Sequence, residues 1–455
     1  MIARGRDAML SPLQAALRDA KGDEAELWVH RRRSAITRYA KNEIHQNAVA
    51  DETHVQARVV IGKAMGIASA NSLDPAELRR LVGDAAAAAR ESAPNAEWPG
   101  LAEPSAVAEA RSYDADTARA DAADQADAIK RITAAVKARG FRAAGTHQIE
   151  LTEDSLANTN GVAHYAPSTM AYLRALVTSD TGTGWAEDLG WSTRSLDADG
   201  VGSRAIEKAA LDRDRTQLPP GDYEAVFEEL AVAEVLRFMS LTGLTGQTLK
   251  DGRSFMKDAF GQQVTGPRFS LWDDGLDDRT LAIPFDVEGT AKRRVPLVED
   301  GVACGVVHDR QSSQWFGTRS TGHAADPRRY PPGGHAGNLV MRGDDATMEQ
   351  LVGAVSRGIL ITRFHYTNTP DPKRATMTGT TRDGTFLIED GRITRALANV
   401  RYTMSALDLF AGIDLLGPQR LARDWWSSNG MGSIVCLCPP IKVARATITG
   451  SSPVT

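Results

Sequence analysis

The sequence predicts an α+β fold, in which an N-terminal antiparallel sheet with packed helices is followed by a mostly β C-terminal domain. Alternating apolar and polar residues over 25–70 are typical of strands. Apolar residues at helical spacing predict a helix over 228–242, and the remainder contains short apolar runs punctuated by glycine. Because one core rarely grows beyond about 250 to 300 residues, a chain of 455 residues should hold several domains.

The N-terminal elements follow from local patterns. A short amphipathic helix precedes residue 25, and two alternating runs after it predict strands that meet at a turn of Gly62 and Lys63. The carboxylate of Asp74 can accept hydrogen bonds from the first free N–H groups of a helix, and Pro75 suits the first helical position. The alanines after them favour continuation of that helix.

The central part of the chain is predicted to contain a helix and a hairpin. Residues 116–139 are rich in alanine and charged residues and are followed by glycine, which predicts one long, exposed helix. Asn160 and Gly161 are a favoured type I′ turn pair, so two strands should form a hairpin there. Charged residues, prolines and a glycine over 212–221 mark a boundary. The predicted domains are residues 1–104, 105–215 and 216–455.

Composition limits the function classes. A net charge of −5 with 24% charged residues argues against nucleic-acid binding through a basic face. Arg31, Arg32 and Arg33 form a local basic run, which we interpret as strand or turn surface. No apolar stretch reaches the roughly 18 to 20 residues that span a bilayer, so no membrane partner is expected. Three cysteines and no apolar leader region predict a cytoplasmic location.

The helix predicted near residue 235 has unusual residues at its centre. Residues 235–247 resemble the zinc-binding helix of the TldD/PmbA peptidase family, whose active subunit reads L-L-H-E-A-x-G-H-x-L-E-G-D there. In an ungapped alignment, the two metal-binding histidines become Arg237 and Thr242, and the catalytic glutamate becomes Phe238. A guanidinium has no lone pair for zinc, and a phenyl ring cannot accept a proton. The resemblance therefore implies that these are degenerate metal-site positions.

Further blocks in the family's order extend the resemblance over nearly the whole chain. They are residues 218–221, 252–255, 272–275, 285–290, 298–301 and 320–322. Residues 378–391 look like the version found in the PmbA, or TldE, half of the family. The family's third metal ligand is a cysteine in a G-x-C-G-K segment, whereas the matching neighbourhood, 426–432, contains no cysteine.

The resemblance implies a zinc-free PmbA/TldE-like subunit of a heteromeric metallopeptidase that is inactive alone. A TldD-like partner would carry the zinc, this chain would hold no cofactor, and the substrate would be an unfolded or modified peptide or another amide. Two alternatives are a homodimeric, metal-free hydrolase or natural-product enzyme that uses the repurposed cavity, and a peptide-binding module. In that cavity Arg237 could pair with Glu234, which we favour, or bind a substrate carboxylate.

Several polar residues are candidates for chemistry or for scaffolding. Asp286 and Glu288 lie two residues apart, which on a strand would place both carboxylates on one face for acid/base work. The favoured interpretation is that they hold turns of a scaffold. Ser320, Thr321 and Gly322 predict a turn or a peptide-contacting loop, because no base can be assigned to either hydroxyl.

Two pairs of residues could in principle bind a metal. Cys436 and Cys438 would point to the same side of a strand, either toward a soft metal or into a core. His323 and His335 flank a loop rich in proline and glycine and could meet in space. We favour the core for the cysteines and hydrogen bonding within the loop for the histidines.

Overall fold

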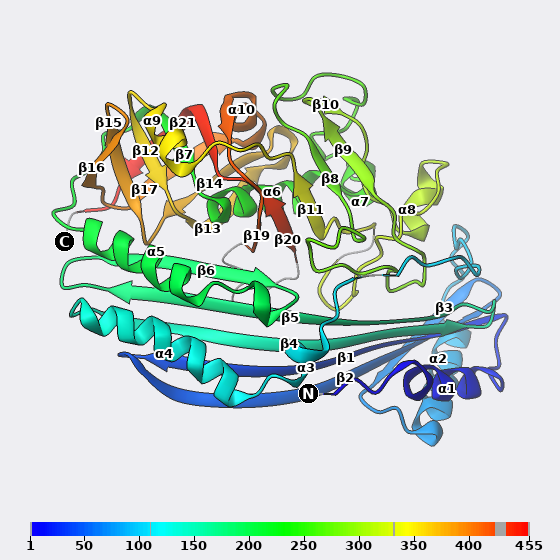
Figure 1. Ribbon diagram of the computed structural model, residues 1–455. Coiled ribbons are helices and arrows are strands. Elements are labelled where there is room, and N and C mark those ends of the chain that lie inside the picture. Colours follow the sequence, from blue (N-terminus) through cyan, green and yellow to red (C-terminus); the bar gives the residue numbers. More distant parts are fainter. Residues whose placement is uncertain (1, 110, 331–332, 424–433, 454–455) are drawn as a thin grey trace.

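The computed structural model describes residues 2–109, 111–330, 333–423 and 434–453. The N-terminal half is a long, curved, six-stranded antiparallel sheet, and the C-terminal half lies over one of its faces (Figure 1). The strand order is β3-β2-β1-β4-β5-β6. The strands are β1 (Glu24–Ala40), β2 (Glu43–Ile61), β3 (Ala64–Ala70), β4 (Arg142–Asn158), β5 (Ala163–Thr178) and β6 (Thr183–Gly190).

Helices cover the opposite face of this sheet. They are α1 (Arg6–Leu17) and α2 (Pro75–Glu91) at one end, and α4 (Ala122–Ala138) and α5 (Ala198–Leu211) at the other, with the short α3 (Ala115–Arg119) and η1 (Thr193–Ser195). Successive side chains of a strand point to opposite faces. Leu27 and Val29 of β1 therefore pack in the core beneath α1 and α2, whereas Trp28 and His30 face the C-terminal half.

The local predictions for the N-terminal half are largely confirmed. Gly62 and Lys63 form the turn between β2 and β3, and β4 and β5 form the predicted hairpin. The carboxylate of Asp74 accepts hydrogen bonds from the N–H groups of Ala76 and Glu77 at 2.9 and 3.1 Å and so caps α2.

The prediction of a single helix over 116–139 is wrong. The chain forms α3, leaves the helical path, and starts again as α4. Asp121 is the cause, because its carboxylate accepts from the N–H groups of Ala123 and Asp124 while the Asp124 carboxylate accepts from the N–H of Asp121. This capping box makes position 121 a helix start rather than a helix interior.

The two N-terminal domains predicted from the sequence share one sheet. β1 pairs with β2 along one side and with β4 along the other, so residues on both sides of position 104 contribute neighbouring strands. A boundary at 104 therefore lies within one structural layer. The segment around it crosses the sheet as an extended linker.

The C-terminal half contains two more sheets, of six and nine strands, with α6 packed between them. The first has the order β10-β9-β8-β11-β20-β19: β8 (Leu271–Asp273), β9 (Val295–Glu299), β10 (Val302–Ala303), β11 (Asn338–Met341), β19 (Arg420–Ala422) and β20 (Val435–Cys438). The second has the order β13-β14-β17-β21-β7-β12-β15-β16, with β18 beside β21.

The remaining elements complete this half. The strands of the second sheet are β7 (Gly221–Phe227), β12 (Arg357–Ile361), β13 (Phe364–Asp371), β14 (Thr376–Thr381), β15 (Thr385–Glu389), β16 (Arg392–Ala396), β17 (Val400–Ser405), β18 (Ile413–Leu416) and β21 (Ile441–Ser451). The helices are α6 (Glu229–Gly243), α7 (Gly246–Lys250), α8 (Arg310–Trp315), α9 (Met348–Gly353), α10 (Ala406–Ala411) and η2 (Pro372–Arg374). The predicted fold class, α+β with a mostly β C-terminal half, is confirmed.

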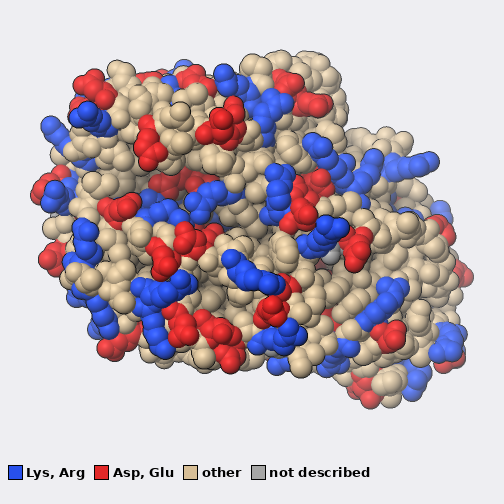
Figure 2. Space-filling view, viewed as in Figure 1, with Lys and Arg blue, Asp and Glu red and all other residues tan. Residues whose placement is uncertain are grey.

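The arginine run of β1 is neutralised by acidic residues on the neighbouring strands. Arg31 is buried and pairs with Asp51 and Glu153 at 2.9 and 2.6 Å. Arg32 and Arg33 also have acidic partners. Basic and acidic side chains are likewise intermixed over the face seen in Figure 2. Among the described helices, none has the length and apolar character needed to cross a membrane.

Candidate functional site

Helix α6 carries the three unusual residues predicted from the sequence, and its polar groups are bonded to its surroundings. The Thr242 hydroxyl donates to the carbonyl of Phe238, one turn earlier, at 2.6 Å. Ser240 donates to the carbonyl of Ala336 at 2.7 Å, which ties the helix to the 321–337 loop. Arg237 is 8% exposed, with its guanidinium carbon 5.7 Å from the centre of the Phe238 ring.

A buried hydrogen-bond chain fixes the other side of α6. Glu234 is 1% exposed and accepts from the hydroxyl of Thr367 on β13. The Thr367 oxygen is also 2.6 Å from the hydroxyl of Tyr402 on β17. Burial and the Glu234 charge raise the pKa of Tyr402 well above its usual range, so this phenol stays protonated. The chain joins α6 to two strands of the nine-stranded sheet.

Asp286 and Glu288 lie in a turn rather than on a strand. The Asp286 carboxylate accepts from the N–H groups of Glu288, Thr290 and Ala324 at 3.0, 2.9 and 2.8 Å. Gly289, with φ of 75°, completes the turn. The alternative that both carboxylates lie on one face of a strand is therefore corrected. The hydrogen bonds that the Asp286 carboxylate accepts hold this segment in a turn and join it to the 321–337 loop.

The two carboxylates also interact electrostatically. Burial and the neighbouring Glu288 raise the pKa of Asp286 to about 8, against the effect of its backbone donors. Burial likewise raises the pKa of Glu288, against Arg58 and the N–H of Arg310, which donates to it at 3.0 Å. Glu288 thereby links the turn to the N-terminal sheet, since Arg58 belongs to β2.

Ser320, Thr321 and Gly322 form a hydrogen-bonded turn around His308. The Thr321 hydroxyl donates to the His308 carbonyl at 2.9 Å and accepts from its N–H at 2.8 Å. Ser320 donates to the same carbonyl at 3.3 Å and accepts from the N–H of Gly322 at 3.2 Å. Both hydroxyls thus have donors and acceptors within the loop.

A buried hydrogen-bonded pair of side chains follows this turn. His323 Nε2 lies 2.7 Å from Asp273, and its Nδ1 lies 2.8 Å from the carbonyl of Thr321. Burial opposes ionisation of Asp273, but His323, Lys292 and the N–H of Asn338 outweigh it and lower the pKa of Asp273 to about 2. The pair joins β8 to the 321–337 loop, as expected for a scaffold.

His335 lies beside this pair but carries no charge. It is 8% exposed and its ring stacks on Tyr330 at 3.8 Å between centres. Burial and the cations Lys292 and Arg237 lower the pKa of His335 to about 3, although Asp273 opposes them. His323 and His335 therefore occupy one loop cluster, joined through a backbone hydrogen bond from the N–H of His335 to the carbonyl of His323 at 2.8 Å.

A cavity of about 180 Å³ opens between this cluster and the N-terminal sheet. Its walls include Trp28, His30, Asp154, Phe285, Asp286, Lys292, His335 and Asn338. Two of these residues, Asp286 and His335, are candidates predicted from the sequence, and the others are not. Alternation along β1 could have placed Trp28 and His30 on the face toward the C-terminal half, but Lys292 has no sequence signal.

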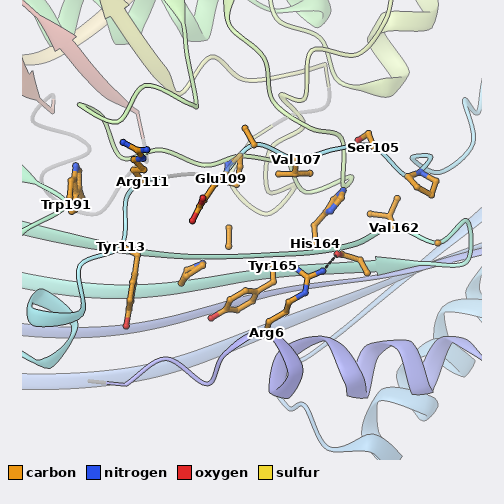
Figure 3. A pocket seen from close by; sticks show the side chains of 17 residues that line it. Arg6, Ser105, Val107, Glu109, Arg111, Tyr113, Val162, His164, Tyr165 and Trp191 are labelled. Carbon is orange, nitrogen blue, oxygen red and sulfur yellow. Dashed lines mark hydrogen bonds between the residues drawn. The ribbon is translucent and has the colours of Figure 1, made fainter.

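A larger cavity, of about 860 Å³, lies between β5 and the linker that begins at residue 104 (Figure 3). Figure 3 shows Glu109 directed into it from the linker, opposite His164 and Tyr165 of β5. Arg6 closes one side and donates to the carbonyl of Ala163 at 2.8 Å. None of the site residues predicted from the sequence lines this cavity.

Two family models match the chain. The "PmbA/TldA metallopeptidase C-terminal domain" covers residues 220–450, and "PmbA/TldA metallopeptidase domain 1" covers residues 25–89. The first model alone spans half of the chain, including α6 and both loop clusters. The chain belongs to the PmbA/TldD family. This confirms the family resemblance identified in the sequence.

Known family members agree with this assignment. The fold is similar to that of TldE from Thermococcus kodakarensis, with a TM-score of 0.87 and 21% identity over 96% of this chain and all of the other. A metalloprotease TldD homolog of Haemophilus influenzae is 23% identical over 38% of this chain and 36% of its own length. The metalloprotease PmbA of Escherichia coli O157:H7 is 23% identical over 44% and 41%. Each of these two alignments spans less than half of the relative.

The zinc site of active PmbA/TldD-family subunits does not fit the residues of α6. A zinc site needs neutral nitrogen, thiolate or carboxylate ligands. The buried Arg237 supplies a fixed positive charge, Phe238 has no ligand atom, and the Thr242 hydroxyl is bonded within the helix. Within the part of the chain that the structure describes, no group of three or more His, Cys, Asp or Glu is placed to hold a metal. The neighbourhood 426–432 lies outside the described residues.

Cys436 and Cys438 pack against α6. Both are buried on β20, and their thiols donate to the carbonyls of Ala233 and Glu229 at 3.7 and 3.4 Å. Burial raises the pKa of the Cys438 thiol well above its usual range, which disfavours the thiolate that a metal would require. The interpretation of the cysteines as core residues is confirmed.

Proposed function

We propose that this chain is the zinc-free, PmbA/TldE-like subunit of a heteromeric metallopeptidase of the cytoplasm. A TldD-like partner supplies the zinc, its bound water and the general base. This chain contributes to the assembly and to the chamber in which an unfolded or modified peptide, or another amide, is cleaved. Alone it has no peptidase activity.

The observation that carries the proposal is the state of α6. Helix α6 is largely buried between the two C-terminal sheets, and Arg237, Phe238 and Thr242 stand where the family motif has the groups that bind and use zinc. This helix lacks the zinc-binding and general-base side chains but still packs in the core. Its bonds through Ser240 and Glu234 to a loop and a sheet support a scaffold role.

Native mass spectrometry of the untagged protein isolated from its own host tests the proposal. One spectrum reports subunit identity, stoichiometry and bound metal. We expect a heteromer with a TldD-like chain whose zinc leaves with that chain on dissociation. A metal-free homodimer as the sole species would overturn the proposal.

Activity measurements provide an independent test. Peptide hydrolysis should require both chains and should be abolished by chelation of zinc. Turnover by this chain alone that persists in chelator would contradict the scaffold role and support a metal-free hydrolase. Peptide binding without turnover, even after addition of the partner, would instead identify a peptide-binding module.

A further inference from the structure

The cavity of about 180 Å³ between the N-terminal sheet and the 321–337 loop contains hydrogen-bonding groups that the fold leaves unused. Lys292 is half-buried in its wall. Its ammonium donates to the side-chain oxygen of Asn338 at 3.3 Å and acts electrostatically on the buried Asp273, but among the described residues it forms no ion pair with a carboxylate. Since an ammonium has three N–H groups, Lys292 can still bind an anion.

Two histidines add to this unused capacity. Among the described residues Nε2 of His335 has no hydrogen-bond partner, although its side chain is buried. His335 is neutral, so in the tautomer with hydrogen on Nε2 it can donate one bond. His30 places Nδ1 2.8 Å from Asp154, and against the effect of burial this carboxylate raises the pKa of His30. His30 also lines the cavity, and when it is protonated its Nε2–H can donate to a ligand.

The acidic groups of the cavity are already engaged. Asp154 bonds to His30, Asp286 accepts three backbone N–H groups, and Asp326 pairs with Arg328 at 2.6 Å. Each acidic group therefore already has a donor, whereas Lys292 and His335 can still donate, which favours an anion over a cation. Trp28 and Phe285 supply apolar walls next to them.

The size of the cavity limits its ligand to one residue. A cavity of roughly 150 Å³ accommodates benzene, so about 180 Å³ is sufficient for one side chain with its terminal group. A free amino acid would bring an ammonium as well as a carboxylate. Because each acidic side chain named above already has a donor, that ammonium would have to compete with this donor for a partner.

We propose that this cavity binds the C-terminal residue of a peptide, with the α-carboxylate at Lys292, His335 and His30 and the side chain against Trp28 and Phe285. The inference rests on the proposed function only in taking a peptide as the ligand. It assigns this subunit a binding role of its own, next to a helix that no longer binds metal.

Isothermal titration calorimetry on the isolated full-length chain tests the site. N-acetyl-L-phenylalanine presents a carboxylate and an aromatic side chain, and its C-terminal amide is the matched neutral ligand. We expect saturable binding of the acid and at least about tenfold weaker binding of the amide, since charge-assisted hydrogen bonds are roughly twice as strong as neutral ones. Free L-phenylalanine should also bind at least about tenfold more weakly than the acetylated acid.

Two variants test whether the acid binds in this cavity. Lys292→Met should weaken binding of the acid at least about tenfold, whereas Lys130→Met, on the exposed surface of α4, should leave it unchanged. Equal binding of acid and amide by the wild type would overturn the inference without any variant. Absence of saturable binding up to about 10 mM, or full binding by Lys292→Met, would also overturn it. Native mass spectrometry decides the subunit role separately, so either proposal can fail alone.

Discussion

The polar side chains of helix α6 and those of the neighbouring cavity differ in how far the fold uses their hydrogen-bonding capacity. In α6, Glu234, Ser240 and Thr242 each bond to a named group of the fold. In the cavity, Lys292 and His335 retain hydrogen-bonding capacity that the described residues do not use. Buried polar groups without partners are costly, so folds retain them mainly where a ligand binds. The fold thus uses the polar groups of α6 for its own hydrogen bonds, whereas those of the adjoining cavity remain available to a ligand.

The largest effect should come from removing a bonded charge in α6. Glu234→Ala removes the acceptor of the Thr367 hydroxyl, which also bonds to Tyr402, and opens a space in the core. We expect a loss of about 3 kcal/mol in the free energy of unfolding. Denaturant unfolding measures it, with the exposed Glu207→Ala on α5 as the control. Lys292→Met should cost about 1 kcal/mol or less; equal losses for the two would remove the distinction between the regions.

The neutral His335 should make stability depend on pH. Its pKa is about 3 in the folded protein and about 6.5 when unfolded, so below pH 6.5 the unfolded chain takes up a proton that the folded chain does not. The stability from this residue is complete above pH 6.5 and is lost as pH falls toward 3. Between pH 7 and pH 5 the loss should be about 2 kcal/mol.

The variant His335→Gln should lack this part of the pH dependence. Denaturant unfolding of wild type and variant at both pH values gives the difference directly. The matched control is His45→Gln, because His45 is exposed on β2. If the stability of His335→Gln depended on pH as that of the wild type does, His335 would have the same pKa in the folded and unfolded chain. Its imidazole would then be as accessible to protons as one on the surface.

Helix α6 could be predicted from the sequence and the cavity could not, for a physical reason. Apolar residues at helical spacing define a helix locally, so the prediction of 228–242 agrees with the observed Glu229–Gly243. The family motif likewise located Arg237, Phe238 and Thr242. The cavity instead combines His30 of β1 with His335, and only tertiary packing brings such distant segments together.

One local prediction failed, and one disfavoured alternative was not realised, because side chains competed with the regular pattern. The carboxylate of Asp121 caps a new helix inside a segment whose composition favours one continuous helix. Asp286 bonds to three backbone N–H groups and curls a segment whose spacing suits a strand. In both cases an aspartate hydrogen-bonded to the backbone outweighed the propensity of its neighbours.

Glycine substitutions should separate the packed end of α6 from an exposed helix surface. In Gly243→Ala the added carbon would lie 2.0 Å from Cε1 of the buried Phe255, so the core must shift. We expect a loss of about 1.5 kcal/mol in unfolding free energy. Gly83→Ala in α2 meets no atom within 4 Å and should stabilise by about 0.5 to 1 kcal/mol. A stable Gly243→Ala protein would show that α6 has room to move.

The smallest change, in zinc binding and peptidase activity, is expected from restoring the missing motif residues. The triple variant Arg237→His, Phe238→Glu, Thr242→His regains the two histidines and the glutamate of the zinc helix, yet hydrolytic zinc sites use three protein ligands. The cysteines cannot serve as the third, because Cys436 and Cys438 bond to carbonyls of α6 itself. We therefore expect no zinc-dependent peptidase activity and no stoichiometric zinc after dialysis, measured with a fluorogenic peptide and by elemental analysis. Zinc-dependent turnover would mean that a third ligand reaches α6, and the helix would then be a metal site only three substitutions from function.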